Sequence, residues 1–134
     1  MAPVARLVAA WGPPLLWAAL IFAFSAQPDL RFVPDDTVDF AVRKAGHMAV
    51  FGILALLVWR ALATTTRVHW TELWALVLTV LYAISDELHQ GAVDGRHASA
   101  LDVGIDSVGA VIAIVIAGLA TARRRAGPDD PLHD

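Results

Sequence analysis

The sequence predicts an all-α protein, an integral membrane four-helix bundle. Its 134 residues are 57% hydrophobic and only 17% charged, with a mean hydropathy of +0.60. This composition is far more apolar than that of a soluble domain of similar size. Four apolar runs approach the roughly 20 residues that a helix needs to cross about 30 Å of hydrocarbon. The sequence lacks the alternating apolar and polar segments of a membrane β-barrel, so helices are favoured over strands.

We expect the helices near residues 7–24, 45–64, 70–84 and 103–122, with the third open to extension as far as residue 90. No internal repeat or linker divides the chain, so residues 1–126 are predicted to form one membrane domain. Residues 127–134 are short, polar and broken by prolines, which predicts a disordered cytoplasmic tail. The chain has no cysteine, which excludes disulfides and thiolate chemistry.

The first apolar run admits two interpretations. Arg6 precedes it and the small residues of "AFSA" follow it, a pattern also found in secretory signal peptides. However, Pro13 and Pro14 lie inside the run, in "WGPPLLW". Membrane helices tolerate such prolines because neighbouring helices satisfy the freed backbone groups. We therefore predict a kinked membrane helix.

The second helix is expected to start at a polar cluster, "RKAGHM", at residues 43–48. Lys44 and His47 are three residues apart in this segment, and residues at that spacing lie on the same face of a helix. We therefore expect the ammonium group and the imidazole to point in one direction.

The third helix is followed by another polar segment, "SDELHQ", at residues 85–90. If the helix continues through it, Asp86 shares a face with His89 and Gln90, whereas Glu87 points about 100° away. The C-terminal end of a helix is negative and disfavours carboxylates. A capping role therefore does not explain these acids.

The fourth helix is preceded by "SALD" at residues 99–102, which fits a capping box of Ser99 and Asp102. Asp106 differs because it lies one turn deeper, inside an apolar run. A carboxylate at membrane depth costs about 2.5–3.5 kcal/mol on insertion scales and usually belongs to a functional path. We therefore favour a structural role for Asp102, which stays a candidate for substrate binding as well, and a functional role for Asp106.

Asp102 and Asp106 are four residues apart on one face, where two ionised carboxylates repel each other. A bound cation, a partner such as Lys44 or Arg96, or a shared proton would each relieve this repulsion, and the sequence leaves the three open. The nearby histidines and acids are sufficient in number for a divalent cation, but metal-binding spacings such as His-Glu-x-x-His are absent. No cofactor is assigned.

The basic residues predict the orientation of the chain. With both termini in the cytoplasm, six of them lie inside and four outside. The inside set is Arg6, Arg60, Arg67, Arg123, Arg124 and Arg125, and the outside set is Arg31, Arg43, Lys44 and Arg96. In this orientation the polar ends of the second, third and fourth helices converge on the extracytoplasmic face.

Several motifs together resemble the VanZ-like family of small bacterial membrane proteins. They are "KAGH" at residues 44–47, "SDELHQGAVDGRHASALDVGIDSVGA" at residues 85–110 and "FSAQP" at residues 24–28. In the last motif, Ala26 occupies a position where a second serine is common. The resemblance implies a multi-pass protein of the bacterial plasma membrane and points to the cell envelope. The name-giving member is linked to teicoplanin resistance, but the resemblance implies no mechanism.

The polar ends provide two sets of candidate site residues. The candidates for proton transfer or for biasing it are His47, Asp86, Glu87, His89 and Asp106. The candidates for binding a substrate are Lys44, Gln90, Arg96, Ser99 and Asp102. Within the second set, Arg96 is suited to phosphate because its guanidinium can donate two parallel hydrogen bonds.

The leading functional hypothesis is an envelope protein that binds or processes a phosphate-bearing lipid or a peptidoglycan-related molecule. The alternatives are a proton- or cation-coupled transporter subunit and a non-enzymatic membrane scaffold or adaptor. The sequence does not decide whether the protein is an enzyme, and it gives no oligomeric state. Membrane lipids are expected partners, whereas no nucleic-acid-binding motif is present.

Overall fold

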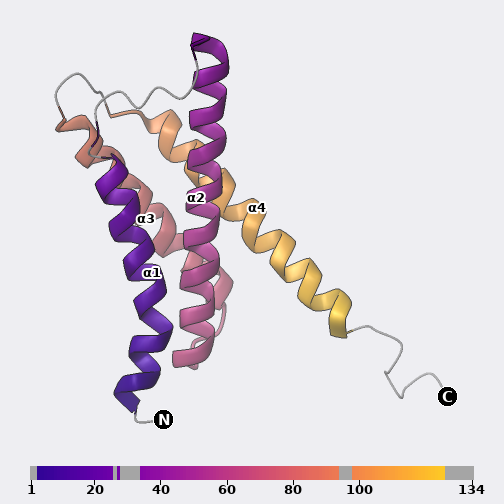
Figure 1. The fold of residues 1–134 in the computed structure, drawn as a ribbon. Helices are drawn as coiled ribbons and strands as arrows, with labels where there is room; N and C mark the ends of the chain where they lie inside the picture. Colours follow the sequence, from indigo (N-terminus) through magenta and orange to yellow (C-terminus); the bar gives the residue numbers. More distant parts are fainter. Residues whose placement is uncertain (1–2, 26, 28–33, 94–97, 126–134) are drawn as a thin grey trace.

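The computed structural model describes residues 3–25, 27, 34–93 and 98–125. Four helices account for most of these residues: α1 (Pro3–Ser25), α2 (Asp36–Thr65), α3 (Thr71–Gly91) and α4 (Ala100–Arg125). No strand occurs in the described ranges. The predicted all-α four-helix architecture is therefore confirmed (Figure 1).

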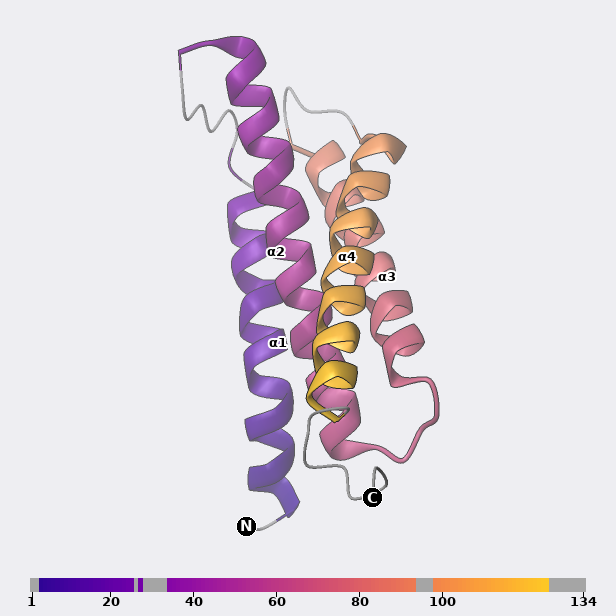
Figure 2. The same ribbon diagram turned by 90° about the vertical axis from the view of Figure 1, so that its right-hand side faces the viewer.

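Helix α2 is the centre of the bundle. It packs against each of the other three helices, whereas α1 and α4 do not contact each other. Consecutive helices run in opposite directions, so the start of α1 and the ends of α2 and α4 lie at the same end of the molecule (Figure 2). Helix α4 crosses α2 obliquely and its C-terminal half diverges from the bundle (Figure 1).

Helix α2 starts nine residues earlier than predicted, at Asp36 rather than near residue 45. Asp35 is its N-cap, and one carboxylate oxygen of Asp35 accepts hydrogen bonds from the backbone N–H groups of Thr37 and Val38, at 3.0 and 2.9 Å. This contact satisfies donors that the first turn of a helix leaves free. Lys44 and His47 consequently lie more than two turns inside α2, and their predicted place at its start is wrong.

We predict that Asp35→Ala lowers the stability of the protein by about 1 kcal/mol, because it removes the side-chain cap of α2. Asp36→Ala is the matched control: it removes the same charge from the next residue, which lies within the first turn rather than at the cap. Thermal unfolding in detergent, followed by circular dichroism, measures both. Equal losses in the two variants would show that charge, rather than the cap, accounts for the effect.

The other helices follow their predicted ranges with longer ends. Helix α3 continues past residue 84 to Gly91, which is the extension that the sequence left open. Helix α1 runs through Pro13 and Pro14 without interruption. Helix α4 starts at Ala100 and reaches Arg125. The polar segment 85–90 is therefore helical throughout, which fixes the directions of its side chains.

The hydrophobic core lies along one face of α2. Phe51, Leu54, Ala55, Val58 and Leu62 are buried there at helical spacing. They pack with five core residues that the other three helices contribute together, namely Ile21, Ala75, Ala83, Ala110 and Ile114. The central position of α2 follows from this continuous apolar face.

Helices α2 and α4 approach closely where both carry glycine. A Cβ atom at Gly52 would lie 3.1 Å from the carbonyl oxygen of Gly109. A Cβ atom at Gly109 would lie 2.7 Å from the Cα of Met48, closer than real Cβ atoms come. Small residues allow such close approach between membrane helices. This crossing lies next to His47 on α2 and one turn from Asp106 on α4.

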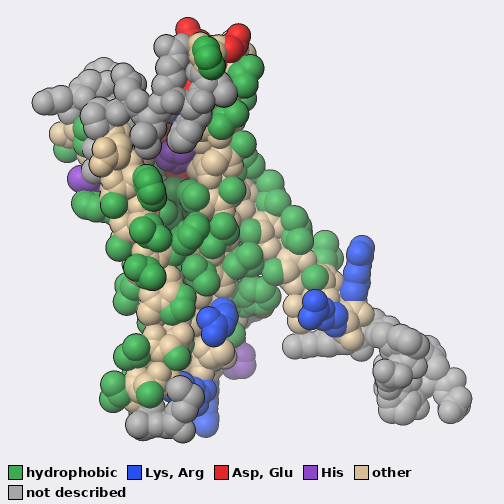
Figure 3. Space-filling model, in the orientation of Figure 1, with side chains coloured by type: hydrophobic (Ala, Val, Ile, Leu, Met, Phe, Trp, Pro, Cys, Tyr) green, Lys and Arg blue, Asp and Glu red, His purple; other side chains and the backbone are tan. Residues whose placement is uncertain are grey.

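Much of the outer surface is apolar, as expected of helices that face lipid (Figure 3). Three helices, α1, α2 and α4, are long and apolar enough to cross a membrane. Helix α3 is not among them: it carries Glu72 near its start and Asp86 and Glu87 near its end. The predicted membrane span within α3 stays a prediction.

Candidate functional site

Polar side chains gather at the end of the bundle formed by the end of α1, the first half of α2, the end of α3 and the start of α4. All but one of the polar or charged side chains that the structure shows as buried lie in these parts of the helices. They are Ser25, Asp39, Asp86, Glu87, Gln90 and Asp106. The exception is Thr79, farther along α3. Buried groups of this kind need partners, and the partners define the site.

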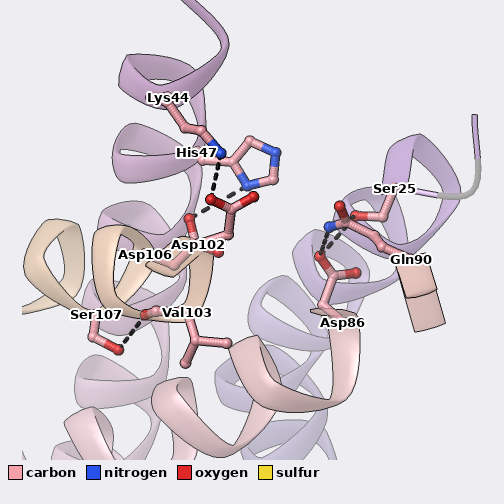
Figure 4. Close-up of polar contacts among 9 residues, drawn as sticks. All are labelled: Ser25, Lys44, His47, Asp86, Gln90, Asp102, Val103, Asp106 and Ser107. Carbon is pink, nitrogen blue, oxygen red and sulfur yellow. Dashed lines mark hydrogen bonds and ion pairs between the residues drawn. The ribbon is translucent and has the colours of Figure 1, made fainter. Parts of the chain in front are cut away.

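Lys44 and Asp102 form an ion pair that joins α2 to α4 (Figure 4). Both side chains are about three-quarters buried, with 23% and 24% of their surface exposed. The predicted capping box, in which Asp102 reaches back to the N–H of Ser99, is wrong. Instead, Glu87 Oε1 accepts the Ser99 N–H at 2.7 Å, which leaves Asp102 for Lys44.

His47 and Asp106 form the second pair between α2 and α4. His47 Nδ1 lies 3.3 Å from Asp106 Oδ1, which is within the range of an ion pair, but the two groups are not aligned as a hydrogen bond. Neither atom has another hydrogen-bond partner among the described residues. The side chain of Asp106 is 2% exposed, whereas that of His47 is 31% exposed. Because Nδ1 is buried, the accessible part of the ring lies on the side away from Asp106.

The two pairs show how the protein accommodates the acids of α4. Asp102 pairs with Lys44, and Asp106 pairs with His47. The two acids are four residues apart on α4, and their two partners are three residues apart on α2, so both pairs lie along the same helix–helix contact. The predicted relief by a partner such as Lys44 is therefore present in the structure. Arg96, the other partner considered, lies outside the described residues. Among those described, no group of three or more potential metal ligands occurs.

A second polar group joins α1 to α3. Ser25 Oγ donates a hydrogen bond to Asp86 Oδ2 at 2.8 Å, and Gln90 Nε2 donates to the same oxygen at 2.9 Å. All three side chains are buried. Asp86 Oδ1 has no hydrogen-bond partner among the described residues. In Figure 4 this group lies to the right of the His47 ring, on α1 and α3.

Glu87 and Asp86 make different contacts, because successive side chains of a helix point about 100° apart. Glu87 reaches the backbone of Ser99 at the start of α4, whereas Asp86 faces Ser25 on α1. Ser99 itself is partly buried. The hydrogen bond from its N–H therefore holds the start of α4 against the end of α3.

His89 is the predicted site residue that the structure places apart from the others. Its ring stacks on Phe22 of α1, with 3.9 Å between the ring centroids and 18° between the planes. His89 Nε2 is buried without a hydrogen-bond partner in the described ranges. The expected face shared by Asp86, His89 and Gln90 brings only Gln90 of these two residues into a hydrogen bond with the Asp86 carboxylate.

Two buried polar residues of this end were not predicted. Ser25 belongs to the "FSAQP" motif, directly before Ala26. Asp39 is 3% exposed and pairs with Arg43 at 3.0 Å, one turn along α2. The spacing of four residues between an acid and a base was a usable signal for that pair. The pair was not predicted because the expected start of the helix, near residue 45, left Asp39 outside it.

Comparison with known proteins agrees with these observations. The family model of VanZ/LLP1 matches residues 10–121, which is most of the chain. No curated protein and no solved structure matches the chain. The match confirms the resemblance drawn from the sequence motifs, and the chain belongs to the VanZ/LLP1 family.

Proposed function

We propose that this VanZ/LLP1 family member binds or processes a phosphate-bearing lipid or a peptidoglycan-related molecule at the extracytoplasmic face of the bacterial plasma membrane. The observation that carries the proposal is the pairing of His47 with the almost fully buried Asp106. The polar end of the bundle is the proposed pocket. The link of the name-giving member to teicoplanin resistance makes glycopeptide susceptibility the first phenotype to measure.

His47 is the proposed proton-transferring group. A carboxylate next to one ring nitrogen orients the imidazole and stabilises its protonated form, which leaves the other nitrogen to exchange a proton with a ligand. In this protein Asp106 provides the carboxylate at Nδ1, and the ring is partly accessible on its other side. Asp86, with one unpaired oxygen, is the proposed second acid.

Lys44 is the proposed anion-binding residue. Its ammonium group is paired with Asp102, but an ammonium has further donors that a phosphate oxygen can accept. Lys44 remains partly exposed beside His47. Arg96 is proposed as the second phosphate-binding side chain, on the strength of its bidentate donor geometry alone.

The distribution of basic residues supports the proposed orientation. Arg6, Arg60, Arg67, Arg123 and Arg124 all belong to the end of the bundle opposite His47, where Figure 3 shows basic side chains. An excess of arginine marks the cytoplasmic side of membrane proteins. We therefore propose that both termini are cytoplasmic and that the His47 site faces outward.

Single cysteines in this cysteine-free chain test the orientation. Asp36→Cys is expected to react with a membrane-impermeant thiol reagent in intact cells, because it lies at the outer end of α2. Arg67→Cys, just beyond the other end of α2, is expected to react only after the cells are opened. Labelling of Arg67→Cys in intact cells would reverse the orientation and place the site in the cytoplasm.

Mass spectrometry of molecules that copurify from bacterial membranes tests the ligand class. The wild-type protein is expected to retain a phosphate-bearing lipid or an envelope precursor, and Lys44→Gln to lose it. Arg124→Gln is the control, since it removes one positive charge at the opposite end of the bundle. Retention of only a protein partner would favour the scaffold hypothesis instead.

A further inference from the structure

An open groove lies at the end of the bundle opposite His47, between the start of α1 and the end of α2. It is lined by Pro3, Arg6, Leu7, Thr65, Thr66 and Arg67. Its volume is about 480 Å³, comparable to that of many small-molecule sites. The proposed function assigns nothing to this groove.

Two arginines give the described lining of the groove a positive charge. Arg6 comes from α1 and Arg67 from the segment that follows α2, and no aspartate or glutamate is among the described residues that line the groove. The Arg6 Nη2 atom donates a hydrogen bond to the backbone oxygen of Thr64 in the last turn of α2. This contact fixes the guanidinium at the groove while its remaining donors stay available to an anion.

The two threonines of the lining are already committed to α2. Thr65 Oγ1 donates to the carbonyl oxygen of Ala61 at 2.6 Å, and Thr66 Oγ1 donates to that of Leu62 at 2.8 Å. Thr65 Oγ1 also accepts a hydrogen bond from Trp11 Nε1 at 3.2 Å. These hydroxyls therefore have no hydrogen left for an anion. The arginines therefore provide the charged contacts to an anionic ligand.

The position of the groove indicates which anion it meets. Both α1 and α2 are long and apolar enough to cross a membrane, so their ends lie near the lipid headgroups. Leu7 extends the groove towards the outer face of α1, where Val4 and Val8 are also exposed. A ligand with a phosphate at the arginines and an acyl chain along this apolar face meets both surfaces.

We propose that this groove binds the phosphate headgroup of an anionic phospholipid, with Arg6 and Arg67 on the phosphate and an acyl chain against Leu7. Basic pockets between membrane helices bind anionic headgroups through the same combination of charge and apolar surface. Lipid binding at this groove is independent of the proposed His47 site and of the orientation of the chain in the membrane.

The test compares lipid binding by the full-length protein in nanodiscs and by native mass spectrometry, with phosphatidylglycerol against phosphatidylcholine as the probes. The wild type is expected to retain phosphatidylglycerol selectively. Arg6→Gln and Arg67→Gln are each expected to weaken this binding about five-fold, and the double variant about twenty-five-fold. The double variant of Arg123→Gln and Arg124→Gln is the matched control, because it removes two positive charges from the same end outside the groove.

Each remaining outcome would overturn the proposal. Unchanged selectivity in the groove double variant would exclude the two arginines, and an equal loss in the control would show attraction to net charge alone. Binding of inorganic phosphate as tight as that of the lipid would make free phosphate the ligand. Since Arg6→Gln also removes a contact with α2, Arg67→Gln serves as the variant that keeps that contact, and unchanged binding in it overturns the two-arginine site.

Discussion

Replacing Asp106 with asparagine is expected to abolish function while the protein reaches the membrane at normal or higher abundance. Asparagine keeps the size of the side chain but cannot ionise, so a charge that costs about 2.5–3.5 kcal/mol at membrane depth is removed. The same change takes away the carboxylate that lies 3.3 Å from His47 Nδ1. General acid–base catalysis contributes about 10²- to 10⁴-fold to rates, and we expect a loss of at least about 10².

Asp102→Asn is the control for this prediction. It removes a carboxylate one turn away that is 24% exposed and pairs with Lys44 rather than with His47. Asparagine can still accept a hydrogen bond from the ammonium, so a smaller loss is expected. Abundance in the membrane fraction and teicoplanin susceptibility are the two measurements. Full function in Asp106→Asn would remove the acid from the mechanism and favour a scaffold, and loss of abundance would identify a structural partner.

Gly109→Leu is expected to separate α2 from α4 and to disrupt the site. Any side chain at this position collides with the backbone of Met48, where even a Cβ atom would lie 2.7 Å from the Cα atom. Overpacking of this kind costs about 1–3 kcal/mol or more, because backbone cannot rotate away as a side chain can. His47 is the residue before Met48, so the separation also lengthens the contact between His47 and Asp106.

Gly104→Leu is the matched control on the same helix, because a Cβ atom there meets nothing within 4 Å. Thermal unfolding in detergent and the susceptibility assay measure both variants. Gly109→Leu is expected to lower the melting temperature by several degrees and Gly104→Leu to leave it nearly unchanged. Equal effects would show that glycine is required for flexibility of α4 rather than for the crossing.

The helices were predictable from the sequence where they are long and apolar enough to cross a membrane. Long apolar runs admit few structures other than helices, and their number and order follow directly. The start of α2 differs from the prediction because its first nine residues precede the apolar run. Asp35 and Asp36 followed by Thr37 form an N-cap signature that lies upstream of the apolar run.

The sequence predicted which residues the site contains, but not which acid pairs with which base. The sequence placed the acids, histidines and Lys44 at one end, because helices that alternate in direction bring those segments together. Which acid meets which base depends on how each helix is rotated about its axis. That rotation is set by contacts such as Gly109 against Met48, which involve residues without charge. Ser25 and its bond to Asp86 were missed for the same reason.

The most direct test of the central claim, that His47 and Asp106 act as one proton-transferring unit, is a double-mutant cycle on teicoplanin susceptibility. It compares the wild type with His47→Gln, Asp106→Asn and the double variant, at matched membrane abundance. Residues that act as a unit lose function non-additively. We predict that each single variant loses nearly all function and that the double variant is no worse than either. Independent, additive losses, or a single variant that keeps full function, would contradict the account.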